Sequence, residues 1–182
     1  MNWPEDDQPV VVEPLDPERH DRAAFRSGIA QVDNYFHRTA NKLAKAGNVR
    51  VYVMTSTGGD LIGFYAINAH AIDYTRLPPR FARNRPGHGS IPAAFLSMMG
   101  VDAGFAGRGH GEVLLTDALL RIHRLSREIG TAVVMLDVLD CGDPERVARR
   151  RNFYLRFGFM PLQAEPARLY LPVATIGALP AP

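Results

Sequence analysis

Residues 101–112 read Val-Asp-Ala-Gly-Phe-Ala-Gly-Arg-Gly-His-Gly-Glu, and this stretch decides the fold. A mostly apolar run over 91–101 precedes it and predicts a strand that is buried on both faces. From Glu112 to about residue 130, apolar residues recur at intervals of three and four, which predicts a helix. Glycine permits positive φ and lets a ligand approach the backbone, and the first turn of a helix presents unpaired N–H groups and the positive end of its dipole. The glycines of this stretch therefore predict a turn that binds a pyrophosphate.

Two other kinds of phosphate-binding turn do not fit. A Rossmann turn needs Gly-x-Gly-x-x-Gly in the first strand–helix unit, with an acidic residue about 20 positions later. Here the spacing differs and the preceding strand is central. A Walker loop needs Gly-Lys-Ser/Thr, which the sequence lacks. The remaining alternative is a connecting loop without a ligand.

The residues before the turn alternate between strand and helix patterns. A short apolar run at 10–12 predicts a first strand, and an amphipathic pattern over 29–46, stopped by Gly47, predicts a helix. β-branched and aromatic residues over 49–55 and 61–69 predict two strands joined by a Gly-Gly hairpin turn.

Residues 75–90 combine proline and glycine with four arginines, which predicts a long loop too polar to be core. The alternation of helix and strand patterns predicts a mixed α/β sheet. The elements after the turn and its helix are a strand over 131–139, a helix from Asp143-Pro144 to about Phe157, and short strands at Phe159 and over 168–171.

The length of 182 residues predicts one domain over 1–182, with its core at about 10–172. The chain has no run of about 18 apolar residues, so no membrane span is expected. The first seven residues are acidic and lack the pattern of a secretory signal. One cysteine excludes an internal disulfide and a cysteine-rich zinc site. We therefore expect a cytoplasmic protein that binds no metal.

The basic residues are mostly arginines, gathered in short stretches although the formal net charge is only +2. The rigid fork of arginine suits bidentate phosphate contacts. These arginines therefore predict contacts to a phosphate-rich partner, or alternatively a solvated surface. The candidates for phosphate contacts are Arg76, Arg80, Arg83, Arg85, Arg149, Arg150 and Arg151.

At the glycine turn the sequence resembles the GCN5-related N-acetyltransferases. Their motif A, Gln/Arg-x-x-Gly-x-Gly/Ala, is matched at Gly109 and Gly111, while Ala106 stands at its first position. Phe153-Tyr154-Leu155-Arg156-Phe157-Gly158-Phe159 matches the end of their motif B. The resemblance covers about residues 10–172. It implies a mixed, mostly antiparallel central sheet, splayed at the acetyl-CoA site and flanked by helices.

A narrower resemblance is to the toxin branch of that family, in type II toxin–antitoxin systems. It lies in Phe25-Arg26-Ser27-Gly28, in Val32-Asp33-Asn34-Tyr35-Phe36, in Val51-Tyr52-Val53 and in Gly63-Phe64-Tyr65-Ala66. The loop over 77–86 is also similar, whereas 141–151 departs by being richer in arginine. This branch implies acetylation of the α-amine of aminoacyl-tRNA, a ribbon-helix-helix antitoxin as partner, and a homodimer.

The resemblance also implies a role for each site residue. The backbone of the central strand would hold the pantetheine arm and polarise the acetyl carbonyl. The amides of the turn would bind the pyrophosphate of acetyl-CoA, and Tyr154 would protonate the departing thiolate, as a positioned acid does. A tyrosine merely packed on the sheet is the structural alternative. The residues expected to bind acetyl-CoA are Met99, Gly100, Val101, Gly107, Arg108, Gly109, His110, Gly111 and Glu112.

The general base and the acceptor stay open at this point. His70, His88, His110 and His123 are available as bases, a water chain is an alternative, and Asp102 is expected to position the turn rather than to take a proton. The acceptor is aminoacyl-tRNA, or alternatively a small-molecule or protein amine. A CoA-binding module without turnover is a further alternative, which Tyr154 and the intact glycines disfavour.

Overall fold

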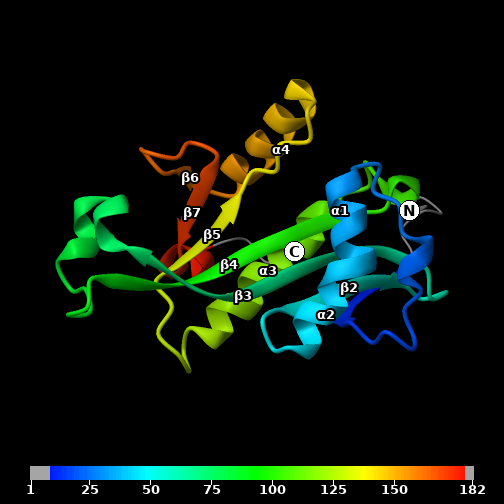
Figure 1. Cartoon of the computed structure of the whole chain (residues 1–182), viewed down its shortest axis with the longest axis horizontal. Helices are drawn as coiled ribbons and strands as arrows, with labels where there is room; N and C mark the ends of the chain where they lie inside the picture. Colours follow the sequence, from blue (N-terminus) through cyan, green and yellow to red (C-terminus); the bar gives the residue numbers. More distant parts are fainter. Residues whose placement is uncertain (1–8, 179–182) are drawn as a thin grey trace, which may run out of the picture. The chain divides into compact units, whose positions relative to one another are not determined.

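The computed structural model describes residues 9–178, so the acidic residues 1–7 and the tail after Ala178 lie outside the described residues. Seven strands form one sheet in the order β1-β2-β3-β4-β5-β7-β6, and β4 and β5 run parallel in it. The predicted mixed, mostly antiparallel sheet is confirmed (Figure 1). The strands are β1 (Val10–Pro14), β2 (Arg50–Ser56), β3 (Leu61–Asp73), β4 (Ser90–Val101), β5 (Val133–Asp137), β6 (Met160–Pro161) and β7 (Arg168–Pro172).

The chain divides into two compact units. The first comprises residues 1–66 and 98–117, and the second comprises 67–97 and 118–182. Strands β3 and β4 and the helix α3 (His110–Leu125) run from one unit into the other.

In the first unit, β1 pairs antiparallel with β2 from Val10↔Ser56 to Pro14↔Tyr52. A helical segment precedes β2 and consists of α1 (Ala30–Asn34), a π-helix (Tyr35–Thr39) and α2 (Ala40–Lys45). Gly47, whose φ is +77°, ends this segment. The predicted helix over 29–46 is therefore present, but a π-helical stretch interrupts it.

An aromatic cluster forms the centre of the first unit. The rings of Phe36 and Phe64 stack with centroids 4.0 Å apart, and Phe25 meets both edge-on at 5.0 and 5.4 Å. All three rings are at most 1% exposed. This cluster fixes the loop at 25–28 and the helical segment on β3, because aromatic pairs of this geometry stabilise beyond their buried area.

In the second unit, β5 pairs parallel with β4 and antiparallel with β7, and β6 pairs with β7. The helix α4 (Pro144–Arg156) starts where it was predicted, because the Asp143 side chain accepts from the N–H groups of Glu145 and Arg146. It ends at Gly158, whose φ is +89°. A short helix (Val173–Ala178) follows β7.

Two expectations about burial are wrong. The loop over 75–90 contains short 3₁₀ helices at Tyr74–Arg76 and Pro79–Ala82, and Leu77 between them packs in the core with Ile72 and Ile91. Strand β4 is not buried on both faces along its whole length, because its last residues, 97–101, are partly exposed. The apolar run concealed this change, since glycine and serine at its end fit either environment.

Within residues 9–178, every helix is too short or too polar to cross a lipid bilayer. The same residues contain no cluster of three or more His, Cys, Asp or Glu side chains suited to a metal ion.

Candidate active site

The glycine turn has the backbone shape that was predicted. Gly107 and Gly109 have φ of +77° and +82°, and α3 begins at His110. The amides of Glu112 and Val113 donate to the carbonyl of Gly109 at 3.0 and 3.3 Å. A Cβ atom placed on Gly107 or Gly109 would meet nothing within 4 Å. The outer side of the turn is therefore open, and a phosphate group could reach its backbone.

Asp102 positions the turn, as predicted. Its carboxylate accepts from the amide of Gly104 at 2.9 Å and from the amide of Arg26 at 2.7 Å. The amide of Ala103 in return donates to the carbonyl of Arg26 at 2.7 Å. The loop that carries the toxin-like residues 25–28 is thus bound directly to the residues that lead into the glycine turn.

Gly100 on β4 lies against residues that carry the resemblance to the toxin branch. A Cβ on Gly100 would lie 2.5 Å from Cγ1 of Val32, 3.3 Å from the ring of Phe64 and 3.5 Å from that of Phe25. Only glycine fits here without displacing these groups. The residues of the narrower resemblance therefore pack on the strand that is expected to hold pantetheine.

Strand β4 extends past its pairing with β5. The paired residues run from Ala93↔Val133 to Phe95↔Met135, while β4 continues to Val101. Met99, Gly100 and Val101, the predicted pantetheine residues, are half-buried in this extension. Strand β3 pairs with one edge of β4, and an extended pantetheine amide would suit the backbone N–H and C=O groups of its other edge.

Gly63 on β3 faces this extension closely. A Cβ on Gly63 would lie 2.8 Å from the carbonyl oxygen of Gly100 and 2.8 Å from Cδ1 of Leu114. Gly63→Ala should therefore lower the free energy of unfolding by about 1–3 kcal/mol, the usual cost of overpacking, as measured by urea denaturation. Gly130→Ala is the matched control, because a Cβ there meets nothing within 4 Å. Equal stability of the two variants would contradict the close approach.

The side chains of the turn lie on one aromatic ring. The guanidinium carbon of Arg108 is 5.8 Å from the centroid of Phe105, and the ring of His110 is 6.2 Å from it. Arg108 is exposed and His110 half-buried. We therefore expect the backbone of the turn, rather than these side chains, to make the main phosphate contacts.

Tyr154, the predicted catalytic residue, lies on α4 in the second unit and is 6% exposed. Its ring packs against Phe153 at 5.2 Å and Phe159 at 5.9 Å. Burial raises the pKa of the Tyr154 hydroxyl to about 12, and the positive charge of Arg150, one helical turn earlier, partly opposes this rise. The phenol is therefore protonated at physiological pH and able to donate.

Several of the predicted phosphate-binding arginines make contacts within the second unit. Arg150 donates to the carbonyl of Leu139 at 2.7 Å, and Arg151 donates to the carbonyl of Pro166. Arg76 pairs with Glu165. The guanidinium carbons of Arg80 and Arg85 lie over the rings of Phe81 and Tyr74, at 5.2 and 4.2 Å, and Arg83 and Arg149 are exposed. These seven arginines therefore do not form one uniform phosphate-binding group.

Among the candidate bases, His70 has the most distinctive surroundings. Its ring lies 5.2 Å from that of Phe95. Partial burial lowers its pKa, and the charges of Arg168 and Arg76 lower it further while Asp137 raises it. His123 lies on α3 next to Gly177. His88 is exposed and lies in the loop before β4.

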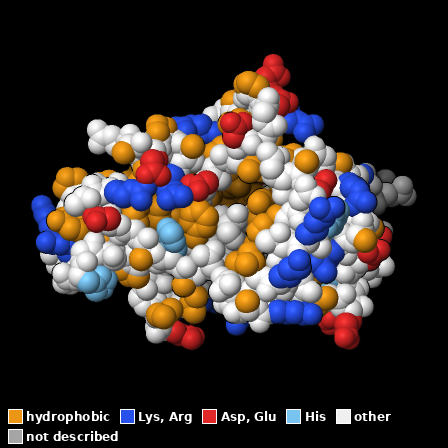
Figure 2. All heavy atoms as spheres, viewed as in Figure 1, with side chains coloured by type: hydrophobic (Ala, Val, Ile, Leu, Met, Phe, Trp, Pro, Cys, Tyr) orange, Lys and Arg blue, Asp and Glu red, His pale blue; other side chains and the backbone are white. Residues whose placement is uncertain are grey.

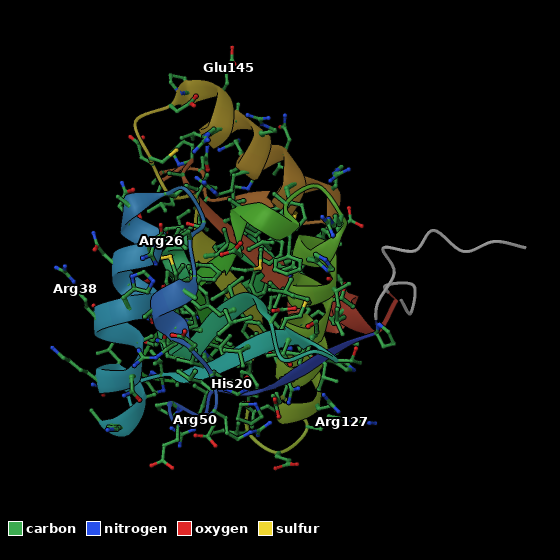
Figure 3. All side chains as sticks on the ribbon, turned by 90° about the vertical axis from the view of Figure 1, so that its right-hand side faces the viewer. His20, Arg26, Arg38, Arg50, Arg127 and Glu145 are labelled. Carbon is green, nitrogen blue, oxygen red and sulfur yellow. The ribbon has the colours of Figure 1, made fainter. Side chains whose placement is uncertain are left out.

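Sequence reasoning missed a basic pocket in the first unit. His20, Arg22, Arg26 and His37 line a hollow of about 420 Å³, together with Pro17, Asp21 and Ala23. Figure 3, in which the right-hand side of Figure 1 faces the viewer, labels His20 and Arg26. His20, Arg22 and Arg26 lie close together in the sequence, but only the fold brings His37 to them and forms the hollow.

Comparison with known proteins finds several curated relatives, of which two are described here, although no protein-family model matches the chain. A probable toxin TacT of Sinorhizobium fredii is 59% identical over 170 residues, which are 93% of this chain and 94% of that protein. A tRNA-acetylating toxin of Mycobacterium tuberculosis is 30% identical over 151 residues, 83% of this chain and 85% of that protein.

Two solved structures have the same fold. AtaT complexed with acetyl-methionyl-tRNAfMet superposes with a TM-score of 0.80 at 18% identity, over 93% of this chain and 98% of that one. A mutant of AtaT bound to the C-terminus of the antitoxin AtaR and to acetyl-CoA gives 0.75 at 17% identity, over 93% and 96%. At these identities the likeness establishes the fold that the residues of the glycine turn had predicted.

Proposed function

The chain belongs to the family of tRNA-acetylating toxins, the toxin branch of the GCN5-related N-acetyltransferases, and on that basis we propose that it transfers an acetyl group from acetyl-CoA to the α-amine of aminoacyl-tRNA. The observation that carries this proposal is the glycine turn before α3, tied through Asp102 to the loop at 25–28. It joins the expected acetyl-CoA site to the residues that resemble the toxin branch.

Acetyl-CoA is the donor in this proposal. The backbone of Gly107, Arg108, Gly109, His110, Gly111 and Glu112 binds its pyrophosphate, because the first turn of α3 points amides and the positive end of the helix dipole outward. The open space around Gly107 and Gly109 fits such a group. Met99, Gly100 and Val101, on the part of β4 that extends past β5, bind the pantetheine arm.

Tyr154 supplies the proton for the leaving group. The amine nitrogen attacks the thioester carbonyl carbon and forms the C–N bond, the C–S bond breaks, and the sulfur takes a proton from the Tyr154 hydroxyl. Solvent accepts the proton released by the nitrogen and reprotonates the phenolate. Since a pKa of about 12 makes Tyr154 a weak acid, the nearby charge of Arg150 assists by stabilising the phenolate.

The acceptor is an RNA in this proposal, so activity should depend strongly on salt. Raising salt from about 50 to 200 mM should lower kcat/KM for aminoacyl-tRNA at least about tenfold, because the release of counterions from the RNA contributes less to binding at higher salt. The same change should leave kcat/KM for a small amino-acid ester nearly constant. Steady-state rates over a salt series measure both. A flat dependence with tRNA would favour the alternative acceptors, a small-molecule or protein amine.

Further partners follow from the family. The solved relative bound to an antitoxin C-terminus supports an antitoxin for this chain. We propose that this antitoxin is of the ribbon-helix-helix type and that the toxin is a homodimer. The likeness over 93% of the chain also supports the predicted organisation as one acetyltransferase domain.

The direct test is incubation of aminoacyl-tRNA pools with the protein and isotope-labelled acetyl-CoA, followed by mass spectrometry. Label on the α-amine of one or a few aminoacyl-tRNAs is expected. Label found only on small amines or proteins, with none on aminoacyl-tRNA, would overturn the proposal.

A further inference from the structure

A basic surface covers the helical segment of the first unit. Between residues 20 and 46 the sequence has five Lys and Arg side chains against two carboxylates, Asp21 and Asp33. Asp21 accepts from the amide of Ala23, and Asp33 accepts from the amide and hydroxyl of Ser27. Both carboxylates thus shape the local backbone. The five basic residues, called here the N-terminal basic surface, are Arg22, Arg26, Arg38, Lys42 and Lys45.

These side chains gather on one side. Arg38, Lys42 and Lys45 follow one another at intervals of four and three along the helical segment, so they share a face, and all three are exposed. Figure 2 shows Lys and Arg side chains gathered over the region where Figure 1 draws α1 and α2. Figure 3 labels Arg26 and Arg38 in the same half of the view, over and beside this segment.

The π-helix shapes one end of the surface into a pocket. Arg22 Nη1 donates to the carbonyls of Phe36 and His37 in the π-helix, at 3.0 and 3.4 Å. Arg26 Nη1 donates to the carbonyls of Ala23 and Phe25, at 2.6 and 2.7 Å. One nitrogen of each guanidinium is therefore fixed to the backbone, and the two forks are oriented before any ligand arrives.

Two histidines complete the pocket wall. Nε2 of His37 lies 2.9 Å from the carbonyl of Phe25 and 3.3 Å from Arg26 Nη1. Nδ1 of His20 accepts from the amide of Asp16, so its Nε2 carries the hydrogen and donates to Glu13 at 3.1 Å. The hollow of about 420 Å³ between them is in the size range of ligand pockets.

Oriented guanidinium groups next to a row of exposed cations suit the binding of several phosphate groups. Pre-oriented arginines bind phosphate oxygens at a lower entropic cost, and successive lysines and arginines match a chain of phosphates rather than a single one. We propose that the N-terminal basic surface binds the phosphodiester backbone of the RNA acceptor, with one phosphate held in the pocket between Arg22 and Arg26. This inference rests on the proposed function for the identity of its ligand.

The seven arginines singled out in the sequence suit this task less well. Arg76 is paired with Glu165, and Arg150 and Arg151 are bound to backbone carbonyls. Binding of a phosphate at Arg76 would require release of its ion pair. Arg151 lines a hollow together with Asp140 rather than with other cations, whereas Arg38, Lys42 and Lys45 are exposed on the segment that Arg22 contacts.

The test is the double variant Arg38→Glu/Lys42→Glu, with Arg124→Glu/Arg127→Glu as the control of equal charge change. Arg124 and Arg127, at the end of α3 and just after it, are also exposed, and Figure 3 labels Arg127. For the first variant, KM for aminoacyl-tRNA should rise at least about tenfold, and the slope of log affinity for deacylated tRNA against log salt should fall by about two. Its kcat, and its activity on a small amino-acid ester, should stay within about twofold of wild type.

Three outcomes would overturn the inference. One is unchanged affinity for deacylated tRNA in the first variant, and another is an equal loss in the control. The third is loss of neutralisation by the antitoxin with an unchanged KM for tRNA, which would assign the surface to an acidic peptide. Binding of deacylated tRNA needs no acetyl transfer, so it distinguishes failure of this inference from failure of the proposed function.

The pocket has its own measurement. The ring resonances of His20 and His37 in the full-length protein should shift when deacylated tRNA is added at low salt, and should return when salt releases the RNA. Rings that do not respond while tRNA binds would exclude a phosphate from the pocket.

Discussion

Tyr154→Phe should lower kcat for acetyl transfer by about ten- to ten-thousand-fold while the Kd for acetyl-CoA stays within about twofold, as expected for loss of a positioned acid. Tyr154 is 6% exposed and its ring packs against Phe153 and Phe159, so phenylalanine keeps the packing and removes only the hydroxyl. Single-turnover rates with labelled acetyl-CoA measure the chemical step, and calorimetric titration measures binding.

Tyr170→Phe is the matched control for this prediction. Tyr170 on β7 is 4% exposed, and its hydroxyl lies 3.8 Å from Sδ of Met160. It therefore offers the same chemical change in another buried tyrosine of the second unit. Equal turnover of the Tyr154→Phe variant and wild type, or an equal loss in the Tyr170→Phe variant, would remove Tyr154 from the mechanism.

The pH dependence follows from the same burial. The pKa of Tyr154 is raised from 10.0 to about 12, so the donating, protonated form persists as pH rises. Ionisation of this tyrosine should then cause no loss of kcat between about pH 8 and 10, the range in which an ordinary phenol begins to ionise. A decline with a midpoint near 10 that disappears in the Tyr154→Phe variant would show an unperturbed tyrosine instead.

Gly109→Ala should raise the Kd for acetyl-CoA at least about tenfold. Gly109 has a φ of +82°, a conformation that costs an L-residue about 1–2 kcal/mol. A Cβ there meets nothing within 4 Å, so the protein itself has room for it. The new methyl group instead occupies the open side of the turn, where the pyrophosphate is expected to meet the backbone amides.

The control separates backbone strain from ligand contact. Gly47, at the end of α2, has a φ of +77° and equally open surroundings. Gly47→Ala should lower the Tm as much as Gly109→Ala does, yet leave the Kd for acetyl-CoA unchanged. If both variants bind acetyl-CoA as wild type does, the turn is not the phosphate site.

The parts of the fold that depend on neighbouring residues could be predicted from the sequence. The conformation of Gly107 and Gly109, the cap at Asp143 and the hairpin before β3 each involve a few consecutive residues. Local residue types therefore determine them, and the predictions for the turn and for the start of α4 agree with the structure.

Features that join distant residues could not be predicted. The requirement for glycine at position 100 comes from Val32 and Phe25, about seventy residues earlier. Arg22 binds carbonyls of a π-helix that hydrophobic periodicity averages into an ordinary helix. Arg150 and Arg151 looked like surface charges because the sequence does not show that carbonyls of Leu139 and Pro166 lie within their reach.

The π-helix at Tyr35–Thr39 also limits how this segment can evolve. An α-helix uses about 3.6 residues per turn, whereas a π turn is wider and takes up one extra residue without changing the phase of the residues after it. Deleting one residue there would let the stretch return to α-helical geometry with Ala40 still in the core and Lys42 still on its present face. The length of this stretch is therefore constrained by the carbonyls of Phe36 and His37 that Arg22 contacts, rather than by the packing of the helix.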